Sequence, residues 1–213
     1  MIKRGGKMVK LTNLQKDALR EVENIGSGNA ATALSEMFGT ETKISLSHLS
    51  VIHIKHASKK IKKHKGIIVA LYAPLRGDFS GNTISVFFSK KDAFTVADLL
   101  LNRKIGTTRF MGMEEQRALK KMGDALSNAY TSSLSKFLKL KIKQLPQRIT
   151  TIFGESIEDL VFKDFGDKKI HSLLLKTHFT IGSVNIKGEF ALIAFLKSVN
   201  VLLKAIEKKL KKK

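Results

Sequence analysis

A line of polar side chains lies in the first long helical segment of the sequence. Asp17, Glu21 and Asn24 follow one another at intervals of four and three residues. At about 100° per residue, these positions fall within roughly 60° of arc on a helix, so the side chains lie one above another. Together they offer carboxylate acceptors and one carboxamide, which both donates and accepts hydrogen bonds. The pattern fits either a reactive or partner-contacting line, or an ordinary solvated helix face.

Glycine and asparagine interrupt the helix directly after this line. Asn24, Gly26, Gly28 and Asn29 stand within six positions, although each Gly costs about 1 kcal/mol relative to Ala in a helix interior. Gly28 also lies on the arc of the polar line. The sequence therefore predicts close approach at this point by another helix or by the backbone of a partner.

Other kinds of site fit the sequence poorly. The stretch GSGN follows no strand and lacks the GxGxxG and GxxxxGK[ST] patterns of phosphate loops. The six histidines offer no HxxxH pair, and His53 and His56 would face opposite sides of a strand. No Ser-His-Asp or GxSxG arrangement is visible. We expect the polar line to act without a metal or cofactor of this protein's own.

The composition predicts a soluble, cytoplasmic, globular protein. The chain has 213 residues, 43% hydrophobic and 27% charged, which suits one domain or two small ones. No apolar run approaches the ~18 residues of a membrane-spanning helix, so we expect no membrane insertion. The basic start MIKRGGKMVK is followed by no apolar stretch of a signal peptide. The absence of cysteine excludes disulfides and thiolate metal sites.

The charge is strongly basic, with 39 Lys+Arg against 18 Asp+Glu and a formal net charge of +21. Much of the excess lies in residues 59–65 and in the tail 204–213. Such charge can attract nucleic acid, an anionic membrane or an acidic protein. Neither cluster contains an aromatic residue or a recognition motif, which disfavours nucleic acid. A Lys-rich solvated surface is the favoured interpretation, and electrostatic steering of acidic partners stays open.

Hydrophobic periodicity predicts helices and strands in a repeated order. The first helix carries an apolar stripe of Leu14, Ala18, Val22 and Ile25, with Thr12 or Asn13 as its N-cap. Residues 149–165 give no clear pattern. The predicted elements are a helix over 11–38, a strand over 43–54, a hairpin of 66–74 and 82–89, a helix over 90–102 with Ser89 as N-cap, a helix over about 114–138, strands over 171–181 and 185–195, and a closing helix over about 198–210.

An internal duplication explains this order. The segment from Glu21 aligns without gaps with the segment from Lys121, at an offset of 100 residues. We predict a single domain over 1–213 made of two similar halves, about 11–105 and 111–213, ending in a basic C-terminal tail. Because the strands are linked by hairpins, we expect an α+β fold with a largely antiparallel sheet packed with two long helices.

The first helix resembles a known family. Residues 18–39, ALREVENIGSGNAATALSEMFG, are similar to the signature helix of the CheC family of chemotaxis phosphatases, related to CheX and FliY. Residues 73–89 resemble the family's central hairpin, and 135–146 the end of its second signature helix. The family pattern is Asp or Ser, three residues, Glu, two residues, Asn, twenty-two residues and Pro. Asp17, Glu21 and Asn24 match it, and Ser47 stands where Pro is expected.

The resemblance implies hydrolysis of the acyl phosphate on a CheY-type response regulator, with Mg²⁺ held by the regulator. Asn24 would orient the attacking water, and Glu21 would pair with the regulator's active-site lysine; these two are the predicted catalytic residues. Asp17, Gly28 and Ser47 are predicted to contact the partner.

The second copy of the motif is degenerate. Arg117, Lys121 and Asp124 stand where Asp or Ser, Glu and Asn are expected, and Gln147 stands at the Pro position. We therefore expect the second half to be structural. The alternative for the whole chain is a non-enzymatic adaptor that binds a response regulator, the receptor deamidase CheD or a motor switch component. The degenerate copy and Ser47 favour the adaptor, and the intact first motif favours the phosphatase.

Overall fold

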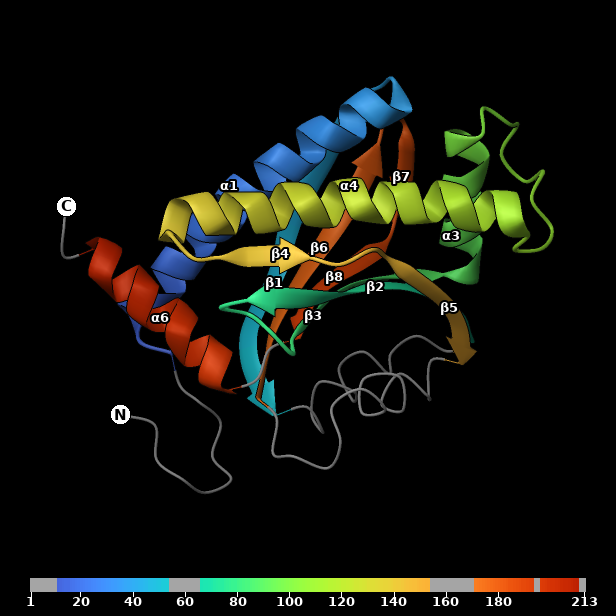
Figure 1. Cartoon of the computed structure of the whole chain (residues 1–213). Coiled ribbons are helices and arrows are strands. Elements are labelled where there is room, and N and C mark those ends of the chain that lie inside the picture. Colours follow the sequence, from blue (N-terminus) through green and yellow to red (C-terminus); the bar gives the residue numbers. More distant parts are fainter. Residues whose placement is uncertain (1–10, 54–65, 154–170, 194–195, 211–213) are drawn as a thin grey trace.

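The computed structural model describes residues 11–53, 66–153, 171–193 and 196–210 (Figure 1). The cluster 59–65 and the end of the basic tail lie outside these ranges. In chain order the elements are α1 (Asn13–Phe38), β1 (Thr42–His53), β2 (Ile67–Gly77), β3 (Thr83–Ser89), α3 (Lys90–Leu100), α4 (Met113–Leu138), β4 (Ile142–Gln144), β5 (Arg148–Phe153), β6 (His171–Ile181), β7 (Val184–Ile186), β8 (Gly188–Ile193) and α6 (Leu196–Leu210).

The strands form two antiparallel sheets. One has the order β1-β6-β7, and the other has the order β4-β2-β3-β8 with β5 also paired to β2. The predicted hairpin is present, because β2 and β3 pair from Ile68 opposite Ser89 to Pro74 opposite Thr83. Together with the long helices, these sheets confirm the predicted α+β class.

The two long helices lie against each other over the strands (Figure 1). Asn29 Nδ2 of α1 donates to Ser133 Oγ of α4 at 2.7 Å. Their inner faces join the strands in one apolar core, which includes Leu19, Val22, Leu34, Leu71, Ile84, Val86, Leu119, Met122, Leu126 and Phe190. The bounds of α1 and α4 differ by 100 residues at both ends, which favours the duplication; the two similar halves stay a prediction.

Local capping sets where two of the helices begin. The Thr12 hydroxyl accepts from the backbone N–H of Gln15, whose side chain accepts from the Thr12 N–H, so α1 begins with a capping box. This confirms Thr12 rather than Asn13 as the N-cap. Ser89 caps α3 by accepting from the Asp92 N–H at 3.1 Å, as predicted.

Two predictions about the elements need correction, and one segment without a prediction is now assigned. The strand expected over 185–195 is two strands, because β7 pairs with β6 whereas β8 pairs with β3, so the chain changes sheets near Gly188. The strand β5 (Arg148–Phe153) begins just before the segment without a clear pattern, extends into it and pairs with β2. Leu14 is 58% exposed and not part of the buried stripe. The buried face of α1 instead combines Leu19, Val22 and Leu34 with small and polar residues.

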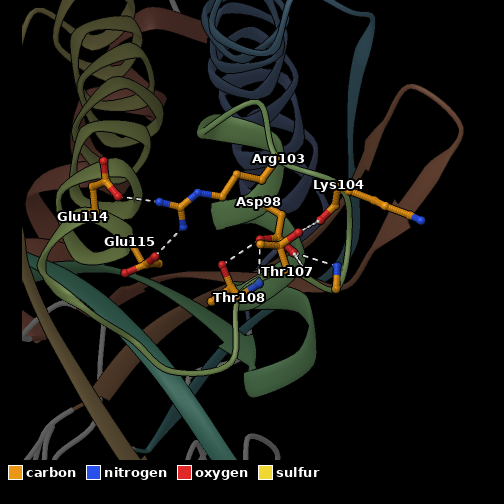
Figure 2. A network of polar contacts seen from close by, with 8 residues as sticks. Asp98, Arg103, Lys104, Thr107, Thr108, Glu114 and Glu115 are labelled. Carbon is orange, nitrogen blue, oxygen red and sulfur yellow. Dashed lines mark hydrogen bonds and ion pairs between the residues drawn. The ribbon is translucent and has the colours of Figure 1, made fainter.

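A buried carboxylate organises the loop between α3 and α4 (Figure 2). Asp98 is 0% exposed. It accepts hydrogen bonds from the backbone N–H groups of Gly106, Thr107 and Thr108 and from the Thr108 hydroxyl. Burial alone would raise the pKa of Asp98, but these hydrogen bonds, led by the Thr108 hydroxyl, lower it below the ordinary value of 3.8.

Arg103 ties the same loop to the start of α4 (Figure 2). Its guanidinium donates to Glu115 Oε1 at 2.6 Å and also to Glu114. The hydrogen bond from Arg103 lowers the pKa of the Glu115 carboxyl. The loop is thus fixed at both ends, by Asp98 of α3 and by the first turn of α4.

Within the described ranges, no helix combines the length and apolarity needed to cross a membrane.

Candidate functional site

The predicted polar line lies on the outer face of α1. Asp17, Glu21, Asn24 and Gly28 are all exposed, so the side chains of the first three are accessible to a partner. The opposite face of α1 packs into the protein through Ala18, Leu19, Val22, Glu23, Gly26, Ser27, Ala30 and Leu34.

The functional groups on this face are largely free. Asp17 Oδ1 lies 3.6 Å from a guanidinium nitrogen of Arg20, and both side chains are mostly exposed. Such a surface pair is worth about 0–1 kcal/mol, so it exchanges easily for a partner's cation. Among the described residues, the side chains of Glu21 and Asn24 have no hydrogen-bond or ion-pair partner. The described residues also hold no group of three or more His, Asp or Glu that could bind a metal ion.

The two glycines of α1 serve different neighbours. A Cβ on Gly26 would lie 2.7 Å from the Tyr130 ring, so Gly26 allows close packing of α1 on α4. A Cβ on Gly28 would meet nothing within 4 Å. Close approach by another helix is therefore present at Gly26, and approach by a partner at Gly28 stays a prediction.

These surroundings predict opposite effects of the same substitution. Gly26→Ala should lower the free energy of unfolding by about 1 to 3 kcal/mol, because the buried Tyr130 ring has to move. Gly28→Ala should raise it by up to about 1 kcal/mol, because alanine favours the helix and nothing obstructs it. Urea unfolding of both variants measures the difference. Equal effects at both positions would contradict the packing role of Gly26.

Ser47, at the Pro position of the motif, coincides with a β-bulge. Leu46 lies opposite Thr177 and His48 opposite Lys176, so Ser47 is the extra residue of β1. Proline is tolerated at bulges because it need not donate to the ladder. The side chain of Ser47 lies outside the described side chains, and its contact with a partner stays a prediction.

The corresponding position in the second half is also irregular. Between the pairs Leu75–Gln144 and Tyr72–Arg148, β2 advances three residues and the opposite chain four. The chain opposite β2 therefore has one extra residue between Gln144 and Arg148. Gln147 lies in this stretch and is buried. Both motif Pro positions thus fall where a strand slips by one residue against its neighbour.

In the second copy, the residue that aligns with Asn24 is used inside the protein. Asp124 Oδ1 accepts from the backbone N–H of Gln147 at 3.2 Å and from Gln144 Nε2 at 3.0 Å. The Gln147 side chain in turn donates to the Gly123 carbonyl and the Ser127 hydroxyl. A proline at 147 has no N–H for Asp124, so the two departures from the motif fit each other. Arg117 and Lys121 remain exposed on α4.

Loss of this carboxylate should affect stability rather than chemistry. Asp124→Ala should lower the free energy of unfolding by about 1 to 3 kcal/mol, because two donors lose their acceptor. Asp124→Asn, which restores the motif residue, should add no second active site, since its oxygen remains tied to Gln147. Urea unfolding and regulator dephosphorylation check the two outcomes. A gain of dephosphorylation activity in Asp124→Asn would contradict this prediction and would show that α4 can form a second active site.

Glu23 is a residue that the sequence interpretation passed over. In the sequence it stands between Glu21 and Asn24 of the polar line, but its side chain lies on the opposite, buried face of α1 and is 1% exposed. Both of its carboxyl oxygens are buried without a hydrogen-bond partner. The alignment with Gly123 carried a signal, since a position that is glycine in one copy is charged in the other.

Comparison with known proteins places this helix in a family context. The model of the CheC-like family matches residues 14–46, which include the whole polar line. Over 152 residues the chain is 24% identical to the CheY-P phosphatase CheC of Bacillus subtilis (strain 168), covering 68% of this chain and 70% of that protein.

Solved structures share the fold over nearly the whole chain. The crystal structure of FliY from Thermotoga maritima matches with a TM-score of 0.80 and 20% identity, covering 95% of this chain and 100% of that chain. A chain of the FliG–FliM complex from H. pylori matches with a TM-score of 0.67 and 12% identity, covering 91% and 100%. At these identities the structural matches establish the fold alone.

Proposed function

We propose that this chain, which belongs to the CheC-like family, hydrolyses the acyl phosphate of a phosphorylated CheY-type response regulator. The observation that carries the proposal is the exposed polar line of Asp17, Glu21 and Asn24, which lies within the residues that match the family. The relative from Bacillus subtilis, named CheY-P phosphatase CheC, supports the same activity.

Asn24 is the residue that acts on water. A regulator that carries its own phosphoryl group and Mg²⁺ lacks only a water molecule positioned in line with the bond that breaks. A carboxamide holds such a water by hydrogen bonds and adds no negative charge beside the phosphate. Asn24 suits this task because its side chain is exposed and has no partner within the described part of the chain.

Glu21 and Asp17 orient the regulator. Glu21 is exposed one turn before Asn24, where its carboxylate can pair with the regulator's active-site lysine. Asp17 makes a flanking contact one further turn away, after giving up its weak contact with Arg20.

Gly28 and Ser47 complete the proposed contact surface. The open space at Gly28 allows the backbone of the regulator to approach α1 closely. Ser47 lies at the β1 bulge, where it lacks the constraint of the usual proline.

The direct test is the decay of the acyl phosphate on a purified cognate regulator, with and without this protein. Faster decay supports the phosphatase. Decay at the intrinsic rate, despite measurable binding of the regulator, would replace the phosphatase with the second candidate.

That second candidate is a non-enzymatic adaptor for a response regulator, CheD or a motor switch component. It is favoured by the loss of the second motif, where Asp124 is engaged in internal hydrogen bonds. The fold shared with a chain of the FliG–FliM complex also suits a binding role. Co-purification with candidate regulators, CheD and motor components identifies the partner in either case.

A further inference from the structure

The carboxyl group of Glu23 is buried, although Glu23 directly precedes Asn24 of the proposed site. Glu23 is 1% exposed, and neither Oε atom has a hydrogen-bond partner. The nearby hydroxyl of Ser27 donates to the Asn24 carbonyl at 3.3 Å. An ionised carboxylate held without partners in a protein interior is costly, so this group favours its neutral form.

The surroundings of Glu23 bear out this preference. Burial raises the pKa of Glu23 above its ordinary value of 4.5. The Ser27 hydroxyl is close enough to oppose this shift in part, but its hydrogen bond goes to the Asn24 carbonyl, so burial prevails. The titratable group on α4 that interacts with Glu23 is Tyr130. Burial raises the pKa of Tyr130, and the negative charge of an ionised Glu23 raises it further. No described cation compensates the carboxyl of Glu23 by an ion pair.

In the second half of the protein, the position equivalent to Glu23 is Gly123, which has no carboxyl group. A Cβ on Gly123 would lie 3.3 Å from side-chain atoms of Leu71 and Gln147, so α4 packs tightly against the sheet there. In α1 the aligned residue is a buried glutamate. The packing of this turn of α1 therefore depends on whether the carboxyl is neutral or charged.

We propose that Glu23 is a positioning residue for Asn24: its neutral carboxyl keeps the turn 23–27 of α1 packed, and its ionisation displaces that turn and Asn24 with it. The link to activity rests on the proposed phosphatase function, whereas the displacement does not.

The physical steps follow from close packing. A charged Glu23 has to gain a water molecule or a cation. The Tyr130 ring already lies against Gly26 in the same turn of α1, so a group that enters beside Glu23 has to disturb this close contact. The turn consequently shifts, and Asn24 shifts with it, because Asn24 follows Glu23 directly and its carbonyl accepts from Ser27.

The first measurement is thermal unfolding between about pH 4 and about pH 9. Since the pKa of Glu23 is raised in the folded state, the folded protein keeps a proton that the unfolded chain loses. The wild type should therefore lose stability as the pH rises above 4.5. Glu23→Gln and Glu23→Met should lack this loss, whereas Glu36→Gln, an exposed control on α1, should retain it. Parallel curves for wild type and both Glu23 variants would overturn the proposal.

The second measurement follows Asn24 itself. In wild-type protein labelled with ¹⁵N, the side-chain amide signal of Asn24 should titrate with Glu23, and in Glu23→Gln it should stay constant. The signal is assigned by its absence in Asn24→Ser. If the signal does not move in the wild type while stability does, Glu23 is a purely structural residue and the positioning role is wrong.

The third measurement is the pH profile of dephosphorylation, corrected for the decay of the regulator alone. The acceleration by wild type should fall as the pH rises, and Glu23→Gln should exceed it by about threefold or more at the alkaline end. Superimposable profiles would overturn the positioning role. If no variant accelerates decay at any pH, the phosphatase function fails, and the Asn24 signal still decides the inference.

Discussion

Replacing Asn24 by alanine should reduce the acceleration of regulator dephosphorylation by about a hundredfold, the typical effect of removing one hydrogen-bonding group that acts in the transition state. The reason is that alanine cannot hold the in-line water. The fold should persist, because the Asn24 side chain is exposed and packs against nothing that the core requires. The measurement is the loss of labelled phosphate from the regulator at saturating concentrations of this protein, so that weaker binding is not mistaken for slower chemistry.

Two variants make this result specific. Asn128→Ala changes an exposed asparagine on α4 and should leave the rate unchanged. Asn24→Asp keeps the shape of the side chain but adds a negative charge beside the phosphate, so it should be at least as inactive as the alanine variant. Full activity of Asn24→Ala would remove Asn24 from the mechanism, and would leave the adaptor as the function of the exposed face.

Replacing Asp98 by alanine should produce the largest loss of stability among the substitutions considered, about 3 to 5 kcal/mol. Three backbone N–H groups and the Thr108 hydroxyl lose a common acceptor in a buried site. Urea unfolding measures the change as a lower midpoint. Asp92→Ala provides the control in the same helix, because that half-buried carboxylate accepts mainly from the Ser89 hydroxyl, and the loss should be at most about 1 kcal/mol.

The pH dependence gives an independent check on Asp98. Its pKa is lowered in the folded state, so its contribution to stability is present above the ordinary value of 3.8 and is lost as the pH falls through the folded value. The difference in free energy of unfolding between wild type and Asp98→Asn should therefore become smaller as the pH falls below 3.8. A difference that is constant with pH would mean that the loop is held by other contacts.

The parts of the fold that sequence predicted are those governed by local signals. Thr12 and Ser89 cap helices through side chains that reach only three residues ahead. The β2–β3 hairpin joins two β-rich runs across a short turn. The line of Asp17, Glu21 and Asn24 was also visible, because helical spacing alone decides which residues share a face.

The parts that sequence missed depend on partners far away in the chain. A continuous β-rich run over 185–195 does not reveal that β7 chooses β6 while β8 chooses β3. The burial of Glu23 depends on the elements that pack against α1, and the periodicity within α1 contains no information about them. The exposure of Leu14 has the same origin, since the buried face of α1 runs through Ala18, Leu19 and Val22 and leaves Leu14 outside it. Residue type predicts which face is able to pack, and the neighbouring helix decides which one does.

The hydrogen bond between Gln15 and Glu207 has a consequence for how the protein is made. Gln15 caps the start of α1, and its Nε2 donates to Glu207 Oε1 in α6, 192 residues later, at 2.9 Å. Near the same place, Lys209 Nζ donates to the Phe137 carbonyl at the end of α4. A ribosome delivers α1 before α6, so these contacts form only after Glu207 and Lys209 have been synthesised. The helix that carries Asn24 should therefore reach its final packing only after α6 has been made, and a fragment that stops after β3 should not assemble the proposed site.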